Sequence, residues 1–226
     1  MSTTPSAQRI LVWDLPTRLF HWSLAVLISL QYATGEFNLL SMQWHFWLGY
    51  ATLALIGFRV LWGFTGSETS RFAAFLRGPR AVLHYFADSV RGREARVPGH
   101  NPLGGWSVML MLAVVAIQAL SGLFTSDDIN EEGPFAAHVS DATVALMTRI
   151  HHFNRYVLLF LIFLHIGVVL LHWVLRNEDL ITPMLHGRAR VGTTGVLRFV
   201  SSWRALALFA LSAALVWGIV VWAEAM

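Results

Sequence analysis

Long runs of apolar residues alternate with short polar segments along this chain. Because the hydrocarbon core of a bilayer is about 30 Å thick, a helix that crosses it needs roughly 20 mostly apolar residues. Five stretches come close to this length and contain almost no Asp, Glu or Arg. The pattern predicts five membrane-spanning helices, at about residues 16–35, 43–64, 104–125, 150–176 and 204–223.

The composition supports a membrane location for the whole chain. Apolar residues make up 56% and charged residues 13% of the 226 residues, and the mean hydropathy is +0.57. A soluble domain is roughly 25% charged, so this chain has too little charge to cover a water-facing surface. We therefore expect an all-α integral membrane protein in contact with membrane lipid. Residues 1–190 form its main domain, and residues 191–226 add a C-terminal transmembrane helix.

The arginines are distributed unevenly between the loops. Six lie between the second and third predicted spans and five follow the fourth, whereas the loops 36–42 and 125–148 contain none. Cytoplasmic loops of membrane proteins hold the excess of positive charge, so the N-terminus is predicted inside and the C-terminus outside. The pI of about 9.9 then reflects topology, and we expect no nucleic-acid partner.

Histidine is the obvious soft ligand in this chain. There are no cysteines and ten histidines. The lack of cysteine excludes disulfides, thiolate-bound iron–sulfur clusters, zinc thiolate sites and covalent haem attachment. A histidine inside a membrane is costly unless it faces the bundle interior and has a partner, which makes it a functional candidate. Five histidines lie in or near the predicted spans: His21, His45, His151, His165 and His172.

The spacing of the histidines in the fourth span places two of them on one helix face. His151 and His165 are 14 residues apart, which is four turns less about 40°, or roughly 21 Å along the axis. His152 falls on the far side and is the weaker candidate ligand. Because neighbouring helices run in opposite directions, His45 lies at the same outer level as His151.

At the inner level, His21 can meet either His165 or His172, and depth alone does not choose between them. Two opposed imidazoles are what a six-coordinate haem iron requires, so the pattern indicates two haems. A single histidine beside tryptophan, as at His21 and His45, also fits an interfacial anchor.

Arginines near the histidines are candidate partners for haem propionates. Arg18 lies three residues before His21 and Arg155 lies four after His151, each about one helical turn away on the same face. Both also fit ordinary anchors at the membrane interface. Arg59 lies 14 residues after His45 at the inner end, where it could serve the inner haem or mark the cytoplasmic boundary.

Several segments resemble the bacterial cytochrome b561 family, which includes the cytochrome b subunits of membrane-bound nickel–iron hydrogenases. The similar stretches cover about residues 10–190 and are VWDLPTRLFHW (12–22), residues 43–64 with His45 and Arg59, HNPLGGW (100–106), residues 150–172 with the 14-residue histidine interval, and RNEDLITPMLHGRAR (176–190).

This resemblance implies a four-helix transmembrane bundle with two non-covalent b-type haems, to which the fifth helix is an addition. It implies His21 and His165 as ligands of the inner haem, and His45 and His151 as ligands of the outer one. It also implies electron transfer in the bacterial inner membrane between the quinone pool and a periplasmic redox protein, such as a hydrogenase-like dehydrogenase or a c-type cytochrome.

We therefore expect an electron-transfer subunit of an oxidoreductase. Ligation by two imidazoles leaves no open iron position, which argues against oxygen or peroxide chemistry at the haems. One alternative is a stand-alone oxidoreductase that takes electrons from superoxide or quinol. A non-redox alternative is a divalent-metal transporter lined by the histidines, although no Asp, Glu or Cys lies within the apolar runs to help bind a cation.

Two loops carry patterns of their own. Residues 79–90 are predicted to form a short helix at the lipid headgroups, or else a solvated basic linker. The acidic residues within 127–132 either attract a basic periplasmic carrier or form an ordinary solvated loop.

Overall fold

Four long helices form the centre of the molecule, and a fifth lies along one side. The computed structural model describes residues 9–93, 97, 99–126, 131–190 and 197–226. Its long helices are α1 (Leu15–Phe37), α2 (Met42–Thr65), α5 (Pro102–Gly122), α6 (Asp141–Arg176) and α8 (Ser202–Glu224). The shorter helices are α3 (Phe72–Phe75), α4 (Pro79–Val90) and α7 (Ile181–His186), with single 3₁₀ turns at Glu68–Ser70 and Ala136–His138.

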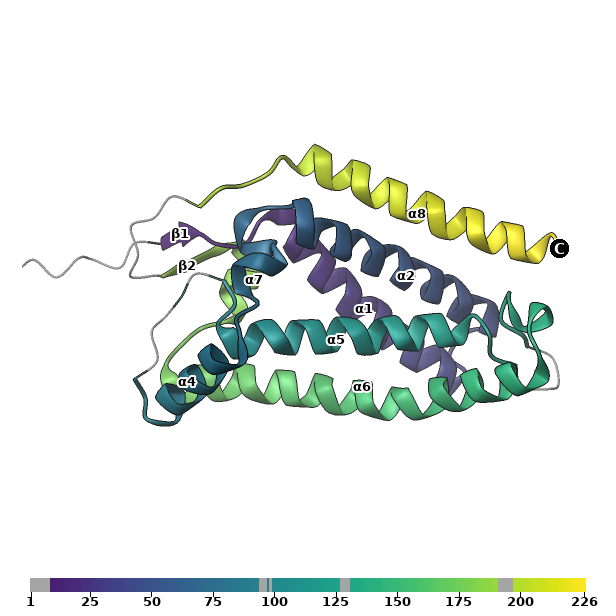
Figure 1. Ribbon diagram of the computed structural model, residues 1–226, viewed down its shortest axis with the longest axis horizontal. Coiled ribbons are helices and arrows are strands. Elements are labelled where there is room, and N and C mark those ends of the chain that lie inside the picture. The colour runs from purple at the N-terminus through teal and green to yellow at the C-terminus, as the bar shows by residue number, and fades with distance from the viewer. Residues whose placement is uncertain (1–8, 94–96, 98, 127–130, 191–196) are drawn as a thin grey trace, which may run out of the picture.

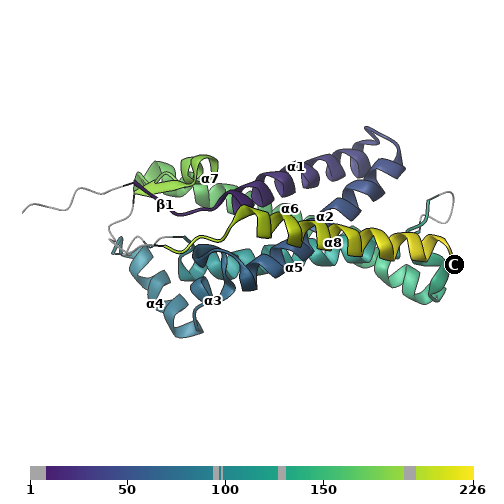
Figure 2. The same ribbon diagram turned by 90° about the horizontal axis from the view of Figure 1, so that it is seen from above.

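The long helices are arranged as two hairpins and an added helix (Figure 1). α1 packs on α2, α5 packs on α6, and α2 also meets α5. Among the described residues, α6 packs mainly against α5 and makes few backbone contacts with α1 or α2. The view from above shows α8 running along α2 over most of its length (Figure 2).

Four of the described helices are long and apolar enough to cross a membrane: α2, α5, α6 and α8. They cover the predicted spans 43–64, 104–125, 150–176 and 204–223. The span predicted at 16–35 is α1, a helix of 23 residues that is not apolar enough by the same measure. α6 begins earlier than predicted, because the Ser140 side chain caps it by accepting from the Thr143 amide at 3.3 Å.

A side-chain cap at one end and a residue with left-handed backbone angles at the other determine where α1 begins and ends. Asp14 accepts from the Thr17 amide at 2.8 Å and starts α1, and Pro16 sits in the first turn, where its missing N–H does no harm. Asn38 ends the helix in the left-handed region with φ 49°. These boundaries place His21 near one end of α1 and leave the other end facing His45.

A polar network closes the end of the bundle where the chain begins. Asp14 also accepts from the indole nitrogen of Trp62 at 3.1 Å, and the Thr17 and Ser70 hydroxyls are 2.7 Å apart. The strands β1 (Arg9–Leu11) and β2 (Arg188–Arg190) pair antiparallel at this end. The amide of Val12 extends the pairing by donating to the Gly187 carbonyl at 2.7 Å. The start of α1 is thus fastened beside the segment that follows α6.

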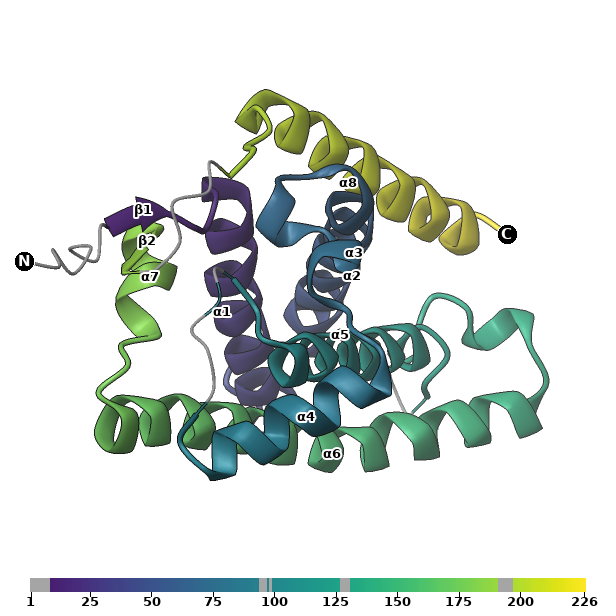
Figure 3. The same cartoon turned by 60° about the vertical axis from the view of Figure 1, so that its left-hand side comes forward.

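α4 is the predicted short helix at residues 79–90, and it lies across the ends of α5 and α6 (Figure 3). The Arg176 side chain donates to the Ser89 carbonyl near the end of α4. Leu83, Phe86 and Val90 are exposed at helical spacing, and their place at the lipid headgroups remains a prediction. Of the acidic loop 127–132, residues 127–130 lie outside the described part of the chain.

Candidate functional site

The structure brings together one inner and one outer pair of histidines. His21 of α1 faces His165 of α6, with ring centroids 6.3 Å apart. His45 of α2 faces His151 of α6, also at 6.3 Å. α6 therefore supplies one ring to each pair, and the two pairs are separated by the 14-residue interval, roughly 21 Å along the helix.

The separation within each pair matches two imidazoles on opposite sides of one metal ion. A metal–nitrogen distance of about 2.0 Å on each side, with the ring centre about 1.1 Å beyond the nitrogen, places two such rings about 6 Å apart. No hydrogen bond joins the two rings of either pair among the described residues. The donor sets thus fit a bis-imidazole haem iron.

The other two histidines of the fourth span make no ring contact with His21 or His45 in the described residues. The ring of His152 lies 6.2 Å from that of its chain neighbour, His151. His172 uses Nδ1 for a contact of 3.0 Å with the Val168 carbonyl of its own helix. His152 is exposed on the outside of α6, as the periodicity predicts. The structure therefore places His165, rather than His172, opposite His21.

The outer histidine on α2 is held by the backbone of α1. His45 Nδ1 lies 3.1 Å from the Gln31 carbonyl and 3.0 Å from the Thr34 hydroxyl. A carbonyl oxygen can only accept, so Nδ1 carries the proton in this contact. Nε2 of the neutral ring then keeps its lone pair, which is the arrangement that metal-binding histidines adopt.

His151 has the same type of support from α5. Its Nδ1 lies 2.9 Å from the Gln118 carbonyl and 3.4 Å from the Ser121 hydroxyl. The amide nitrogen of the Gln118 side chain lies 3.2 Å from Nε2, and the amide oxygen of the same group accepts from Asn154 at 2.8 Å. A metal at Nε2 would have to replace this amide contact.

These two cradles are built from a repeated motif that the sequence analysis missed. Residues 31–35 read QYATG and residues 118–122 read QALSG, so each has glutamine, a hydroxyl residue three later and then glycine. A Cβ at Gly35 would lie 3.0 Å from Cε1 of His45, and one at Gly122 would lie 3.0 Å from Cε1 of His151. The repeat of this motif near the ends of two predicted helices could have identified the residues that support the outer histidines.

The inner pair is held differently. Nδ1 of His21 is buried and has no hydrogen-bond partner in the described residues. The ring packs edge-on against Trp22 at 5.0 Å, and the indole nitrogen of Trp22 donates to the Met184 carbonyl in α7 at 3.1 Å. The inner site thus depends on ring packing where the outer site depends on backbone acceptors.

His100 is a second feature of the inner end that sequence reasoning did not single out as a site residue. It lies just before α5, with its ring 4.7 Å from that of Trp13 and 5.0 Å from that of Phe75. Withdrawal from water lowers the pKa of His100 to about 3, with further contributions from Arg59, His165 and His21. His100 is therefore neutral at physiological pH and lies close to the inner pair.

The two predicted propionate partners each keep one donor without a bond. Arg18 donates through Nη1 to the Leu185 carbonyl at 2.6 Å, and Arg155 donates to Glu36 at 2.6 Å and to the Tyr156 hydroxyl at 2.7 Å. The Nε atoms of both arginines are buried and have no partner among the described residues. Each can still donate to a carboxylate from this position.

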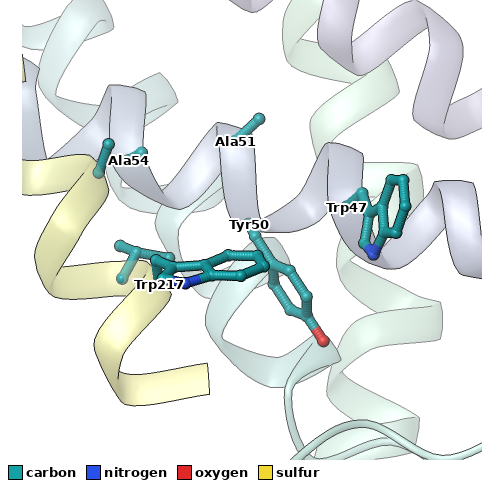
Figure 4. Close-up of a pocket in the computed structure, with 7 residues that line it drawn as sticks. Trp47, Tyr50, Ala51, Ala54 and Trp217 are labelled. Carbon is teal, nitrogen blue, oxygen red and sulfur yellow. The ribbon is translucent and has the colours of Figure 1, made fainter. Parts of the chain in front are cut away.

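A shallow groove of about 300 Å³ lies between α2 and α8, on the side of α2 away from the histidines (Figure 4). Its lining is apolar and aromatic, and the only polar groups in it are the Tyr50 hydroxyl and two indole nitrogens. The lining residues are Trp47, Tyr50, Ala51, Ala54, Ala213, Val216 and Trp217. None of the four paired histidines lines the groove.

The fold and site together define a helical membrane protein with two facing imidazole pairs. A family model described as prokaryotic cytochrome b561 matches residues 12–187, and the chain belongs to this family. Its members are transmembrane b-type cytochromes that transfer electrons, so the predicted family and the expectation of b-type haem are confirmed. No curated protein and no solved structure matches the chain.

Proposed function

We propose that this chain is a di-haem electron-transfer subunit of the bacterial inner membrane. His21 and His165 would hold the inner haem, and His45 and His151 would hold the outer one. The observation that carries this proposal is the equal 6.3 Å separation of the two ring pairs, with α6 contributing one ring to each. When bound, each haem supplies a reversible one-electron iron couple.

The protein holds the ligand nitrogens ready for the metal. The Gln31 and Gln118 carbonyls fix the proton of each outer ring on Nδ1, which keeps Nε2 as the ligand atom. With an imidazole from each of two helices bound to it, the iron would have no open position for a small molecule. Arg18 and Arg155 then bind propionate oxygens through the donors that have no other partner.

α1 crosses the membrane together with α2 in this proposal. The start of α1 is tied to the segment after α6 by β1 and β2, and Glu36 near its end pairs with Arg155 beside the outer histidines. A helix of 23 residues is roughly 34 Å long, which is enough to cross a hydrocarbon core of about 30 Å. Two of its polar side chains contact α2, since the Gln31 amide donates to the Thr52 hydroxyl at 3.0 Å and the Thr34 hydroxyl lies 3.0 Å from His45 Nδ1.

Electrons move between a periplasmic redox partner and the quinone pool. Two haem sites toward opposite membrane faces provide successive stations for an electron while the lipid stays closed to ions. The N-terminus is cytoplasmic, and the partner on the outer face is a hydrogenase-like dehydrogenase or a c-type cytochrome. A stand-alone oxidoreductase of superoxide or quinol would use the same two haems without that partner subunit.

Haem content of histidine variants tests the ligand assignment. The purified wild-type protein is expected to bind two haems per chain. His45→Ala and His151→Ala should each lose the outer haem, and His21→Ala and His165→Ala should each lose the inner one, as measured by haem absorbance against protein mass. His152→Ala and His172→Ala are matched controls on the same helix and should keep both haems.

Two results would overturn the assignment. A colourless wild-type protein expressed with sufficient haem would refute haem binding. Loss of the inner haem from His172→Ala, with retention in His165→Ala, would refute the inner pair.

A further inference from the structure

The described part of the chain contains a buried arginine that the proposed function does not use. Arg59 is 2% exposed in the inner half of α2. Its Nη1 is buried and has no hydrogen-bond partner, and Arg59 forms no ion pair with any described residue. A buried guanidinium with an unpaired nitrogen is costly, so its retention points to a negatively charged partner.

The position of Arg59 on α2 corresponds to that of His165 on α6. Arg59 follows His45 by 14 residues, as His165 follows His151, and each interval is roughly 21 Å long. Arg59 therefore lies on the histidine-bearing face of α2 at the level of the inner pair. The guanidinium packs against Phe20, the residue before His21, which places Arg59 beside the α1 side of the inner site.

The surroundings of Arg59 stabilise its charge without neutralising it. The guanidinium carbon lies 5.1 Å from the ring centre of Phe72 and 5.9 Å from that of Phe20, the residue before His21. Asp14 is the acidic group whose charge acts on Arg59, but its oxygens accept from the Thr17 amide, the Trp62 indole and the Ser70 hydroxyl.

The outer site differs in this respect. Its arginine, Arg155, is paired with the Glu36 carboxylate at 2.6 Å. The inner site therefore has an uncompensated buried positive charge, and the outer site has a compensated one. In a low-dielectric environment such a charge favours the reduced form of a nearby iron, because reduction removes one positive charge from the metal.

We propose that Arg59 is the cationic partner of the inner haem, binds a propionate carboxylate through Nη1, and makes the inner haem easier to reduce than the outer one. This proposal rests on the di-haem function above. The difference in reduction potential would favour electron transfer from the outer haem to the inner one. When both haems are bound, an electron given up by the outer partner would pass to the outer site and then to the inner site, and the quinone pool would be its final acceptor.

Redox titrations of purified holoprotein, followed by haem absorbance, test this proposal. In a His45→Ala background, which retains the inner haem, Arg59→Gln should lower the equilibrium constant for reduction about tenfold, equivalent to about 59 mV for one electron. In a His21→Ala background, which retains the outer haem, the same substitution should leave the potential unchanged. Arg59→Lys keeps the charge and should stay within about threefold of the parent.

The other possible results of these titrations either overturn or support the proposed role of Arg59. An unchanged inner potential in Arg59→Gln, or equal shifts of both haems, would overturn the proposal while leaving the di-haem function intact. Loss of both haems from both Arg59 variants would also overturn it, because Arg59 would then only maintain the fold. Loss of the inner haem from Arg59→Gln alone, with Arg59→Lys retaining it at the parent potential, would support it. A colourless parent protein would instead refute the proposed function.

Discussion

Two glycines decide how closely the outer histidines approach their neighbouring helices. Gly35 of α1 lies against His45, and Gly122 of α5 lies against His151, in cradles of the same construction. Neither glycine has a positive φ, so the backbone itself would accept another residue. The requirement is space beside the imidazole, because the ring must stay where its Nδ1 reaches a backbone carbonyl.

Gly35→Ala should therefore weaken the outer haem site and spare the inner one. The added Cβ would lie 3.0 Å from Cε1 and 3.2 Å from Nδ1 of His45, which forces the ring to shift. Overpacking of this kind costs roughly 1–3 kcal/mol, or about tenfold or more in haem affinity. The fraction of outer haem retained by the His21→Ala protein, with and without Gly35→Ala, measures the effect.

Gly167→Ala provides the control for this substitution, because nothing lies within 4 Å of a Cβ at that position of α6. It should leave both haems in place. Equal haem loss from Gly35→Ala and Gly167→Ala would show that the cradle does not position His45.

Sequence periodicity predicted the facing histidines but not what holds them. The 14-residue interval in α6 and the antiparallel order of the helices are enough to align four imidazoles, because both follow from the helical repeat. The helical repeat did not choose between His165 and His172 as the partner of His21, and only the family resemblance favoured His165. The choice depends on how far α1 is shifted along α6, which the sequence does not give. The contacts of His100 with Trp13 and Phe75 join segments far apart in the chain, so no local pattern could have predicted them.

At the scale of helices, the long apolar elements and the connecting helix α4 were predicted, and the shorter connecting elements were not. α2, α5, α6 and α8 follow the apolar runs, since burial in lipid demands such runs. α3, α7 and the two-stranded sheet are short segments stabilised by tertiary contacts, and their sequences carry little periodicity of their own. The early start of α6 depends on the Ser140 cap, outside the apolar run that marked the span.

α8 is attached to the bundle through a close contact with α2. The Ser212 hydroxyl donates to the Ala54 carbonyl at 2.9 Å, and a Cβ at Gly57 would lie 2.3 Å from that hydroxyl oxygen. Gly57 thus allows the two backbones to approach, in the manner of small residues at membrane helix contacts. α8 carries none of the four paired histidines, so disturbing this contact should change stability without changing haem content.

Gly57→Ala is expected to lower the thermal stability of the holoprotein in detergent, by roughly 1–3 kcal/mol. Ser212→Ala in the same chain should relieve most of this loss, because the new Cβ would then meet only the Cβ at 212, at 3.5 Å. Gly49→Ala is the matched control on α2, since its nearest neighbour would be the Gln31 amide nitrogen at 3.8 Å. Additive losses in the double variant would contradict the contact between α2 and α8.

For the molecule as a whole, the contacts between helix ends constrain which ends lie on the same side in the proposed membrane arrangement. β1 precedes α1 and β2 follows α7, so their pairing puts both segments on one side of the membrane. The arginines of the loop between α2 and α5 belong to the same side, because α2 returns there from the loop at residues 38–41. If α2, α5 and α6 cross the membrane as proposed, this arrangement requires α1 to cross as well, although α1 is not among the helices that are apolar enough to do so by composition.

Introduced cysteines can test this topology directly, because the chain has none of its own. Leu39 and Met226 are 66% and 76% exposed at the predicted periplasmic end, and Leu11 is 39% exposed in β1 at the predicted cytoplasmic end. A membrane-impermeant maleimide added to intact spheroplasts should label Leu39→Cys and Met226→Cys at once, since both thiols face the outside. It should label Leu11→Cys only after the membrane is permeabilised. Labelling of Leu11→Cys and Leu39→Cys from the same side would mean that α1 does not cross, and the histidine pair on α1 and α6 could not then form within the bilayer.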